Sequence, residues 1–106
     1  MSSDFVVALS TLPSEEKAAA LARTLVEEGL AACVNVLPIA RSIYKWKGAL
    51  VEEPEVLCLI KTRRDRLEAL RARLVSLHPY EVPELLALDV AAGHAPYLAW
   101  IDSSLS

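Results

Sequence analysis

The chain has 106 residues, which is enough for one domain and too few for two. Apolar residues make up 54 % of it, the mean hydropathy is +0.33 and the net charge at pH 7 is −3. These values predict a single domain over residues 1–106 with a large core. They argue against a nucleic-acid-binding domain, which is normally basic, and no apolar run approaches the length of a membrane span.

The first third of the chain predicts a strand followed by a helix. A short apolar run over 5–9 is typical of a buried strand. Pro13 and Ser14 then open a helix, with two glutamates in its first turn, where the helix dipole favours anions. Apolar residues recur at helical spacing as far as Val26, and Gly29 follows as the stop.

The middle of the chain predicts two strands joined by a tight turn. Extended runs over 31–36 and 42–46 lie on either side of Pro38, which in a sheet marks an edge, a bulge or a bend. Lys47-Gly48 is the predicted turn. The chain returns as a third strand over 51–62, in which Pro54 indicates a bulge or an edge position.

The last third predicts a helix, a strand and a short final helix. Asp65 can cap the first of these, which must end near His78 because Pro79 disfavours helical geometry in the residue before it. A fourth strand is predicted over 82–90, and the final helix opens at 93–96. In the helix that ends near His78, four leucines at helical spacing predict one buried stripe: Leu67, Leu70, Leu74 and Leu77.

The order strand-helix-strand-strand-helix-strand is the split βαβ, ferredoxin-like plan of an α+β fold with an antiparallel sheet. That plan places both crossover helices on one face of the sheet. The predicted strands are apolar at consecutive positions, so both faces of the sheet require cover. One short C-terminal helix cannot cover the second face alone, and we therefore infer a homo-oligomer that buries it.

The segment 77–84 carries an imidazole, a phenol and two carboxylates between stiffening prolines. His78 is either a structural histidine at a helix end or a metal ligand. Glu84 can pair with Lys61, bind a metal or face water, and one histidine with one glutamate is too few to define a metal site. Cys33, within an apolar strand, is either a small buried side chain or a soft ligand.

Three other features bear on function. Tyr44 and Trp46 share one face of a strand, an arrangement that is typical of packing across an interface and less often of ligand stacking. Lys61, at a strand end, is either solvated or the partner of an anion. The chain has no nucleophile elbow, phosphate loop or HExxH helix, so nothing in it predicts an enzyme.

The cysteines and the N-terminus predict a cytoplasmic protein without a membrane partner. Cys33 and Cys58 form neither a zinc-binding spacing nor a CxxC pair. The first residues have neither the positive charge nor the apolar run of an export signal. These features fit a reducing compartment.

Five motifs stand in order along the chain: LAACVN at 30–35, SIYKWKG at 42–48, KT at 61–62, HPYEVPE at 78–84 and YLAWI at 97–101. Together they resemble the CutA divalent-cation tolerance family. The resemblance implies a ferredoxin-like homotrimer, a cytoplasmic role linked to copper and other divalent cations, and no catalysed reaction.

The resemblance also implies candidate ligands for a divalent ion such as Cu or Zn: His78, Glu84 and Cys33. An enterobacterial branch of the family has a cysteine and a second histidine where this chain has Ser10 and Leu77. Serine and leucine do not replace thiolate and imidazole as metal donors, so we expect weak binding.

The implied trimer is similar in plan to the PII-type signalling proteins, which bind small effectors between subunits. This leaves an alternative open: a sensor that binds an organic anion, with Lys61 as its counter-charge and Tyr80 or Trp46 on its flank. A third interpretation is a stable scaffold that docks on another protein, with Tyr44 and Trp46 in the subunit contact.

Overall fold

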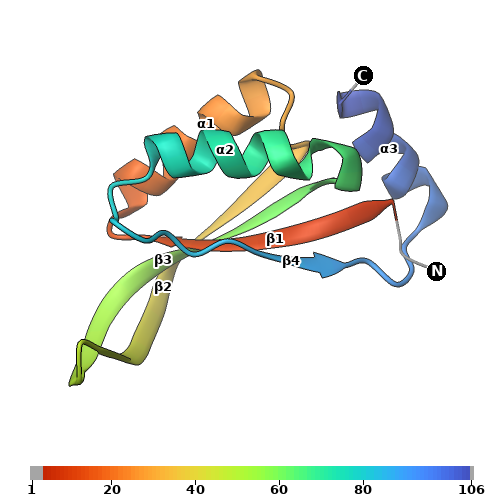
Figure 1. Ribbon diagram of the computed structural model, residues 1–106. Coiled ribbons are helices and arrows are strands. Elements are labelled where there is room, and N and C mark those ends of the chain that lie inside the picture. Colours follow the sequence, from red (N-terminus) through yellow and green to blue (C-terminus); the bar gives the residue numbers. More distant parts are fainter. Residues whose placement is uncertain (1–3, 106) are drawn as a thin grey trace.

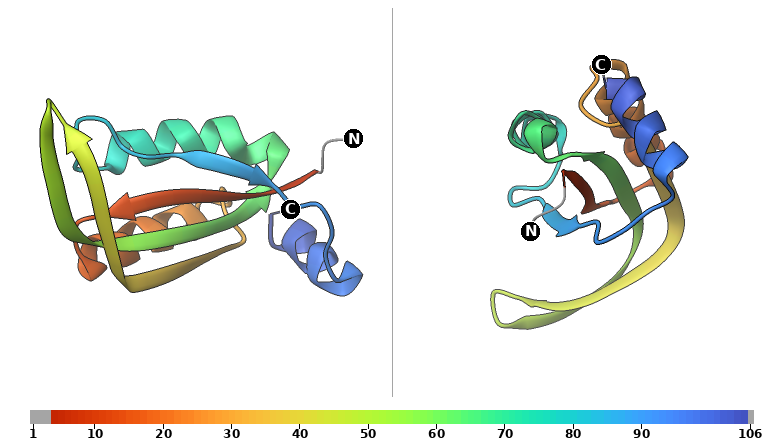
Figure 2. Two further views of the ribbon diagram at one scale, coloured as in Figure 1. Left: turned by 90° about the horizontal axis from the view of Figure 1, so that it is seen from below. Right: turned by 90° about the vertical axis from the view of Figure 1, so that its right-hand side faces the viewer.

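The computed structural model describes residues 4–105. Its centre is one four-stranded antiparallel sheet in the order β2-β3-β1-β4. Two helices, α1 and α2, lie side by side on one face of this sheet, as the ferredoxin-like plan requires, and α3 lies at one end (Figures 1 and 2). The bounds are β1 Phe5–Leu12, α1 Glu15–Glu27, β2 Cys33–Trp46, β3 Ala49–Arg63, α2 Leu67–Leu77, β4 Leu86–Asp89 and α3 Ala95–Leu105.

The predicted ends of α1 are confirmed. The Ser14 side chain accepts a hydrogen bond from the Lys17 backbone N–H at 3.2 Å, which satisfies one of the free donors of the first turn. Gly29 follows the last turn with φ of 72°, a left-handed conformation that glycine adopts without steric cost. The helix therefore begins and ends where its sequence signals lie.

The two extended runs around Pro38 form one strand of 14 residues, β2. The predicted irregularity is a register shift between Leu37 and Ala40. Lys47 and Gly48 form the turn with φ of 51° and 82°, the positive values that suit a two-residue hairpin.

The strand pairing of β3 with β1 ends at Val56, so residues 40–55 form a two-stranded ribbon that projects beyond the body (Figure 1). We call residues 40–55 the hairpin arm; Pro54 lies in it, at an edge position as predicted.

Two boundary predictions are wrong. Asp65 does not cap α2, because its carboxylate is held by Arg63 at 3.0 Å; a short 3-10 turn, Arg64–Arg66, precedes the helix instead. The fourth strand covers Leu86–Asp89 rather than 82–90. Pro79 and Pro83 have no backbone N–H to donate to a neighbouring strand. The segment 79–84 is not part of the sheet and lies beside the hairpin arm instead.

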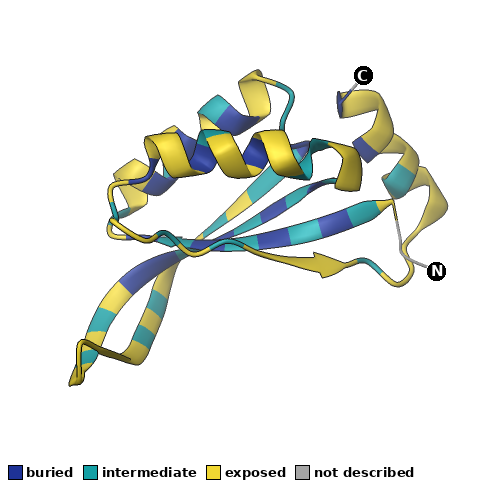
Figure 3. Ribbon diagram, viewed as in Figure 1, coloured by how far each residue is buried: buried dark blue, intermediate teal, exposed yellow. Residues whose placement is uncertain are grey.

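The main core lies between the sheet and the two helices, and a smaller cluster joins α3 to the body (Figure 3). The opposite face of the sheet is also apolar, as predicted from the strands. There the apolar residues of β1 and β3 are half-buried and those of β4 are exposed, with Leu88 at 55 %. This open face consists of Val7, Leu9, Leu57, Leu59, Leu86 and Leu88.

Candidate functional site

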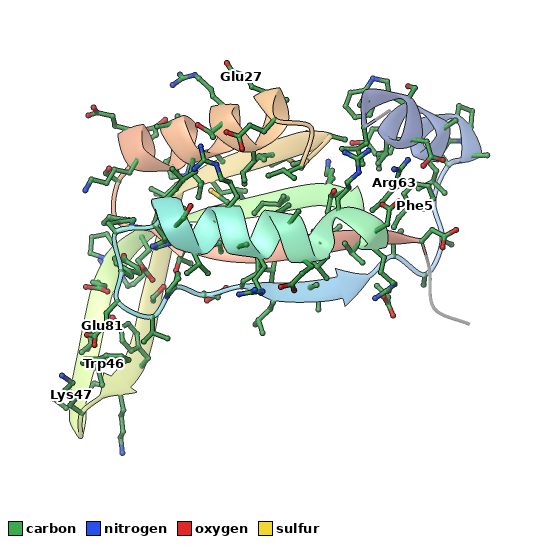
Figure 4. All side chains as sticks on the ribbon, turned by 45° about the horizontal axis from the view of Figure 1, so that its top comes forward. Phe5, Glu27, Trp46, Lys47, Arg63 and Glu81 are labelled. Atoms are coloured by element: carbon green, nitrogen blue, oxygen red, sulfur yellow. The ribbon has the colours of Figure 1, made fainter. Side chains whose placement is uncertain are left out.

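A groove of about 760 Å³ lies between the hairpin arm and the loop that follows α2. Figure 4 shows Trp46, from the arm, and Glu81, from the loop, near one another on this side of the molecule. The groove combines aromatic rings with carboxylates. It is lined by Thr11, Ser42, Ile43, Tyr44, Trp46, Val51, Glu53, Glu55, Pro79, Tyr80, Glu81, Val82 and Glu84.

The register of the arm explains this lining. Ser42 lies opposite Glu53, and Tyr44 lies opposite Val51. Residues directly opposite in an antiparallel pair project to the same face, and so do residues two positions apart on one strand. Tyr44, Glu53 and their neighbours at intervals of two therefore form one wall of the groove.

Two tyrosines orient two of the carboxylates. The Tyr44 hydroxyl donates to Glu53 Oε1 at 2.7 Å, and the Tyr80 hydroxyl donates to Glu55 Oε2 at 2.6 Å. The hydrogen bond to Glu53 raises the pKa of Tyr44, and burial, followed by the hydrogen bond to Glu55, raises the pKa of Tyr80. Both phenols therefore remain protonated donors at neutral pH. Glu55 is only 5 % exposed, so its carboxylate depends on this partner.

His78 lies behind Tyr80 and is 8 % exposed. Its Nε2 is 2.7 Å from the Thr11 carbonyl oxygen, and its Nδ1 is 3.1 Å from the Tyr80 backbone nitrogen. A neutral ring that donates from Nε2 and accepts at Nδ1 satisfies both contacts. The ring also packs against the Tyr80 ring, with centroids 4.8 Å apart. His78 thus ties the loop to β1 and positions Tyr80.

Glu84 is exposed at the edge of the groove. Partial desolvation, and then repulsion from Glu55, raises the pKa of Glu84. Among the described residues that line the groove there is no lysine, arginine or histidine to offset this charge. The groove therefore attracts cations and repels anions.

The predicted site residues divide between two regions. Tyr80, Trp46 and Glu84 line the groove, and His78 supports it. Lys61 and Cys33 are cross-strand partners at the other end of the sheet, where Lys61 Nζ lies 3.2 Å from the Tyr97 hydroxyl. Within residues 4–105, no three side chains of His, Cys, Asp or Glu are grouped so that they could hold a metal ion.

Sequence reasoning did not single out Glu53 and Glu55 as site residues. A signal for them was present, since a two-residue turn at Lys47-Gly48 sets the pairing of the whole arm. Counting outward from that turn places both glutamates on the same face as Tyr44 and Trp46. What the sequence could not supply is the loop after α2 that closes the groove.

No helix among the described residues is long and apolar enough to cross a membrane.

Comparisons with known proteins agree with the fold. The family model of the CutA1 divalent ion tolerance protein matches residues 6–104. The divalent-cation tolerance protein CutA of Thermus thermophilus is 50 % identical over 95 residues, which are 90 % of this chain and 92 % of that protein. A solved structure of CutA from Xylella fastidiosa superposes with a TM-score of 0.95 at 41 % identity, covering 98 % of this chain and 100 % of the other.

A further structure, described as the periplasmic divalent cation tolerance protein CutA from Archaeoglobus fulgidus, has a TM-score of 0.93 at 32 % identity and covers 96 % of this chain and 99 % of its own. The family match spans nearly the whole chain, from β1 to α3, and includes the groove. This chain therefore belongs to the CutA1 divalent ion tolerance protein family.

Proposed function

We propose that this protein binds divalent cations weakly in the acidic groove, and that this binding is its part in divalent-ion tolerance. The observation that carries the proposal is a groove of about 760 Å³ with four glutamates and no basic residue among the described residues that line it. Carboxylate oxygens are ligands for divalent cations. Because these donors are spread along the groove and do not converge, water molecules complete the coordination shell and the affinity is low.

The choice of metal follows from the donors. Copper and zinc favour imidazole and thiolate, whereas carboxylates and water suit harder cations. The imidazole of His78 can take a metal only if one of its two hydrogen bonds breaks, and Cys33 is remote from the groove within one chain. A copper or zinc response through His78, Glu84 and Cys33 stays a prediction, and the groove by itself favours harder ions.

Isothermal titration calorimetry with Mn(II), Zn(II) and Cu(II) tests the proposal. The double variant Glu55→Gln, Glu84→Gln should bind each ion several-fold more weakly than the unchanged chain. Glu27→Gln, on the outer surface of α1, is the matched control and should bind as the unchanged chain does. Equal affinity in the double variant and the unchanged chain would refute the groove as the site. Loss of copper binding in His78→Ala alone, with Mn(II) binding retained, would assign copper to the imidazole.

We also propose that the chain assembles with identical copies, as the homotrimer that the resemblance implies. The apolar open face supports this, because an uncovered patch of this kind on a small domain typically marks a contact. The projecting hairpin arm supports it too, since a two-stranded ribbon alone is marginally stable in water. Sedimentation equilibrium at micromolar concentration should give three times the chain mass, and a monomer would contradict the proposal.

Two further parts of the proposal concern location and chemistry. We place the protein in the cytoplasm, with two free cysteines as the support, although a relative is described as periplasmic. Cell fractionation tests this. We propose a binding role without catalysis, because the family is described by ion tolerance and not by a reaction.

The alternative, a sensor of organic anions, gains no support from the groove. Its carboxylates repel anions, and Lys61 is held by Tyr97 at the other end of the sheet from Trp46 and Tyr80. A thermal-shift screen with nucleotides and small dicarboxylates separates the two functions. A large shift with an anion, and none with metals, would favour the sensor.

A further inference from the structure

We propose that the acidic groove of each chain is completed by a second copy, whose Lys61 forms an ion pair with Glu84 across the subunit contact. This inference rests on the assembly and the cation site proposed above. It adds to them the two residues that face each other and a competitor for the metal ion. Three observations carry it: the place of Lys61 on the open face, the missing partners of both charges, and the distance between them within one chain.

Lys61 lies at one end of the open face of the sheet. It is directly opposite Val7 of β1 and two residues beyond Leu59 on β3, and residues related in these two ways project to the same face. Its Nζ lies 3.2 Å from the Tyr97 hydroxyl and 5.5 Å from the centroid of that ring. An assembly that covers the open face therefore takes the Lys61 ammonium group out of water.

Neither charge has an ion-pair partner within residues 4–105. The polar contact of Lys61 there is the neutral Tyr97 hydroxyl. The Glu84 carboxylate accepts no hydrogen bond from the described residues, and partial desolvation and the charge of Glu55 raise its pKa. Burial of an ammonium group without a counter-charge is costly. The subunit contact must therefore supply a carboxylate to Lys61, and an ammonium group beside Glu84 would offset its repulsion from Glu55.

One chain cannot bring the two charges together. Lys61 is six residues from Glu55 along β3, which is about 20 Å in a strand, and Glu84 lines the groove at the Glu55 end. A ring of three copies joins two different patches head to tail, so each chain needs two complementary surfaces. The acidic groove and Lys61 are opposite in charge and lie at opposite ends of the sheet. They are suited to be these two surfaces.

The ion pair has a consequence for cation binding. An ammonium group beside Glu84 occupies a place that a divalent cation would take. In the assembled protein a metal ion therefore competes with the Lys61 side chain of the partner subunit, which agrees with weak binding. Lys61→Met, which removes the charge and keeps much of the apolar stem, should bind Mn(II) several-fold more tightly than the unchanged chain.

Sedimentation of charge-reversed variants tests the ion pair. Lys61→Glu and Glu84→Lys should each weaken assembly by at least about tenfold in dissociation constant, because like charges then face each other. The double variant Lys61→Glu, Glu84→Lys should restore assembly. Lys17→Glu and Glu27→Lys, which make the same charge changes on exposed positions of α1, are the matched controls and should assemble as the unchanged chain does.

Two outcomes of the sedimentation experiment would overturn the inference. One is normal assembly of Lys61→Glu. The other is a double variant that stays dissociated although circular dichroism shows that both single variants are folded. Glu81→Lys, in the same groove, checks the choice of carboxylate. Rescue of Glu81→Lys by Lys61→Glu, without rescue of Glu84→Lys, would overturn the assignment to Glu84.

Failure of this inference is distinguishable from failure of the earlier proposals. A trimer that tolerates Lys61→Glu overturns the ion pair alone, whereas an unchanged chain that sediments as a monomer overturns the assembly and the ion pair together. Equal Mn(II) affinity in Lys61→Met and the unchanged chain would overturn the competition at the groove. Absence of Mn(II) binding in both, with assembly restored in the double variant, would overturn the cation site and support the ion pair.

Discussion

Two hydroxyls, those of Ser10 and Thr62, are fully buried on the sheet face beneath the helices, and they differ in one respect. The Thr62 hydroxyl donates to the Leu30 carbonyl oxygen at 2.7 Å. Within residues 4–105 the Ser10 hydroxyl has no hydrogen-bond partner, and Cys58 lies opposite it in the sheet. The resemblance matches Ser10 with a cysteine of an enterobacterial branch, and in this structure Ser10 is buried and does not line the groove.

The two hydroxyls should respond in opposite ways to removal. Ser10→Ala should leave the free energy of unfolding unchanged or raise it by up to about 1 kcal/mol, because an unpaired buried polar group is lost. Thr62→Val should lower it by about 1–3 kcal/mol, because the Leu30 carbonyl loses its donor. Urea denaturation of both variants measures this, and equal losses would mean that Ser10 has a partner.

At the scale of the elements, Arg66 connects the ends of two helices. Its guanidinium donates to the Gly29 carbonyl oxygen, just after α1, at 2.7 Å, and to the Leu105 carbonyl oxygen at the end of α3. The Leu105 carbonyl is among the acceptors that a helix end leaves unpaired, and the Gly29 carbonyl belongs to the turn that follows α1. The side chain is half-buried, so the contact is shielded from water.

Loss of this contact should loosen α3. Arg66→Met should cost about 1.5–3 kcal/mol, the usual size for hydrogen bonds from a charged group, and should speed amide hydrogen exchange in α3. Arg71→Met is the control, because Arg71 is exposed and its partner within residues 4–105 is Glu68 of the same helix. Its loss should leave the stability and the amide exchange of α3 nearly unchanged. Unchanged exchange in α3 would show that the apolar contacts of Ile101 and Leu105 suffice.

Glu28 and Arg73 join the end of α1 to α2 through two hydrogen bonds, at 2.9 and 2.8 Å. The hydrogen bonds from Arg73 lower the pKa of Glu28 below its ordinary value. The unfolded chain therefore takes up the proton at a higher pH than the folded one. The stability that the pair contributes is present when the pH is above the pKa of Glu28 in the unfolded chain. It is lost as the pH falls through the lower pKa that Glu28 has in the folded chain.

A pH series tests this pair. Glu28→Gln should have a slightly lower free energy of unfolding than the unchanged chain at pH 7. This difference should disappear as the pH is lowered and Glu28 of the unchanged chain becomes protonated. The effect should be small and should shrink with added salt, because both side chains are about two-fifths exposed. A difference that persisted at low pH would mean that charge is not its cause.

At the scale of the whole molecule, the decisive feature is that only one face of the sheet is covered by α1 and α2 (Figure 2). Leu88, on the open face, is 55 % exposed, and Val26, on the outer surface of α1, is 42 % exposed. In a monomer the two side chains are exposed to a similar extent. In an assembly that covers the open face of the sheet, Leu88 becomes buried and Val26 stays exposed.

A pair of charge substitutions distinguishes the two cases. Leu88→Lys should shift sedimentation toward the single chain and lower the melting temperature, which should also become dependent on protein concentration. Val26→Lys should behave as the unchanged chain does. Identical behaviour of the two variants would contradict assembly through the open face.

Local signals in the chain were sufficient for the order of the elements, both ends of α1, the turn at Lys47-Gly48, and the apolar character of both sheet faces. Each depends on residues within a few positions of one another, through periodicity, capping or turn geometry. The motifs were also sufficient to indicate the family that the comparisons show. The start of α2 was not predictable. The Asp65 carboxylate can accept either from the backbone N–H groups of a helix start or from the Arg63 side chain, and the sequence does not show that it takes Arg63.

Contacts between distant residues decided the site. His78 stood out in the sequence as a ligand candidate, and packing gave both of its ring nitrogens to Thr11 and Tyr80. Lys61 and Cys33 pair at the other end of the sheet, away from the groove. Glu55, by contrast, accepts a hydrogen bond from the hydroxyl of Tyr80, which lies 25 residues further along the chain. The physical reason is that hydrogen-bond partners far apart in sequence depend on strand register and loop placement, which no local pattern encodes.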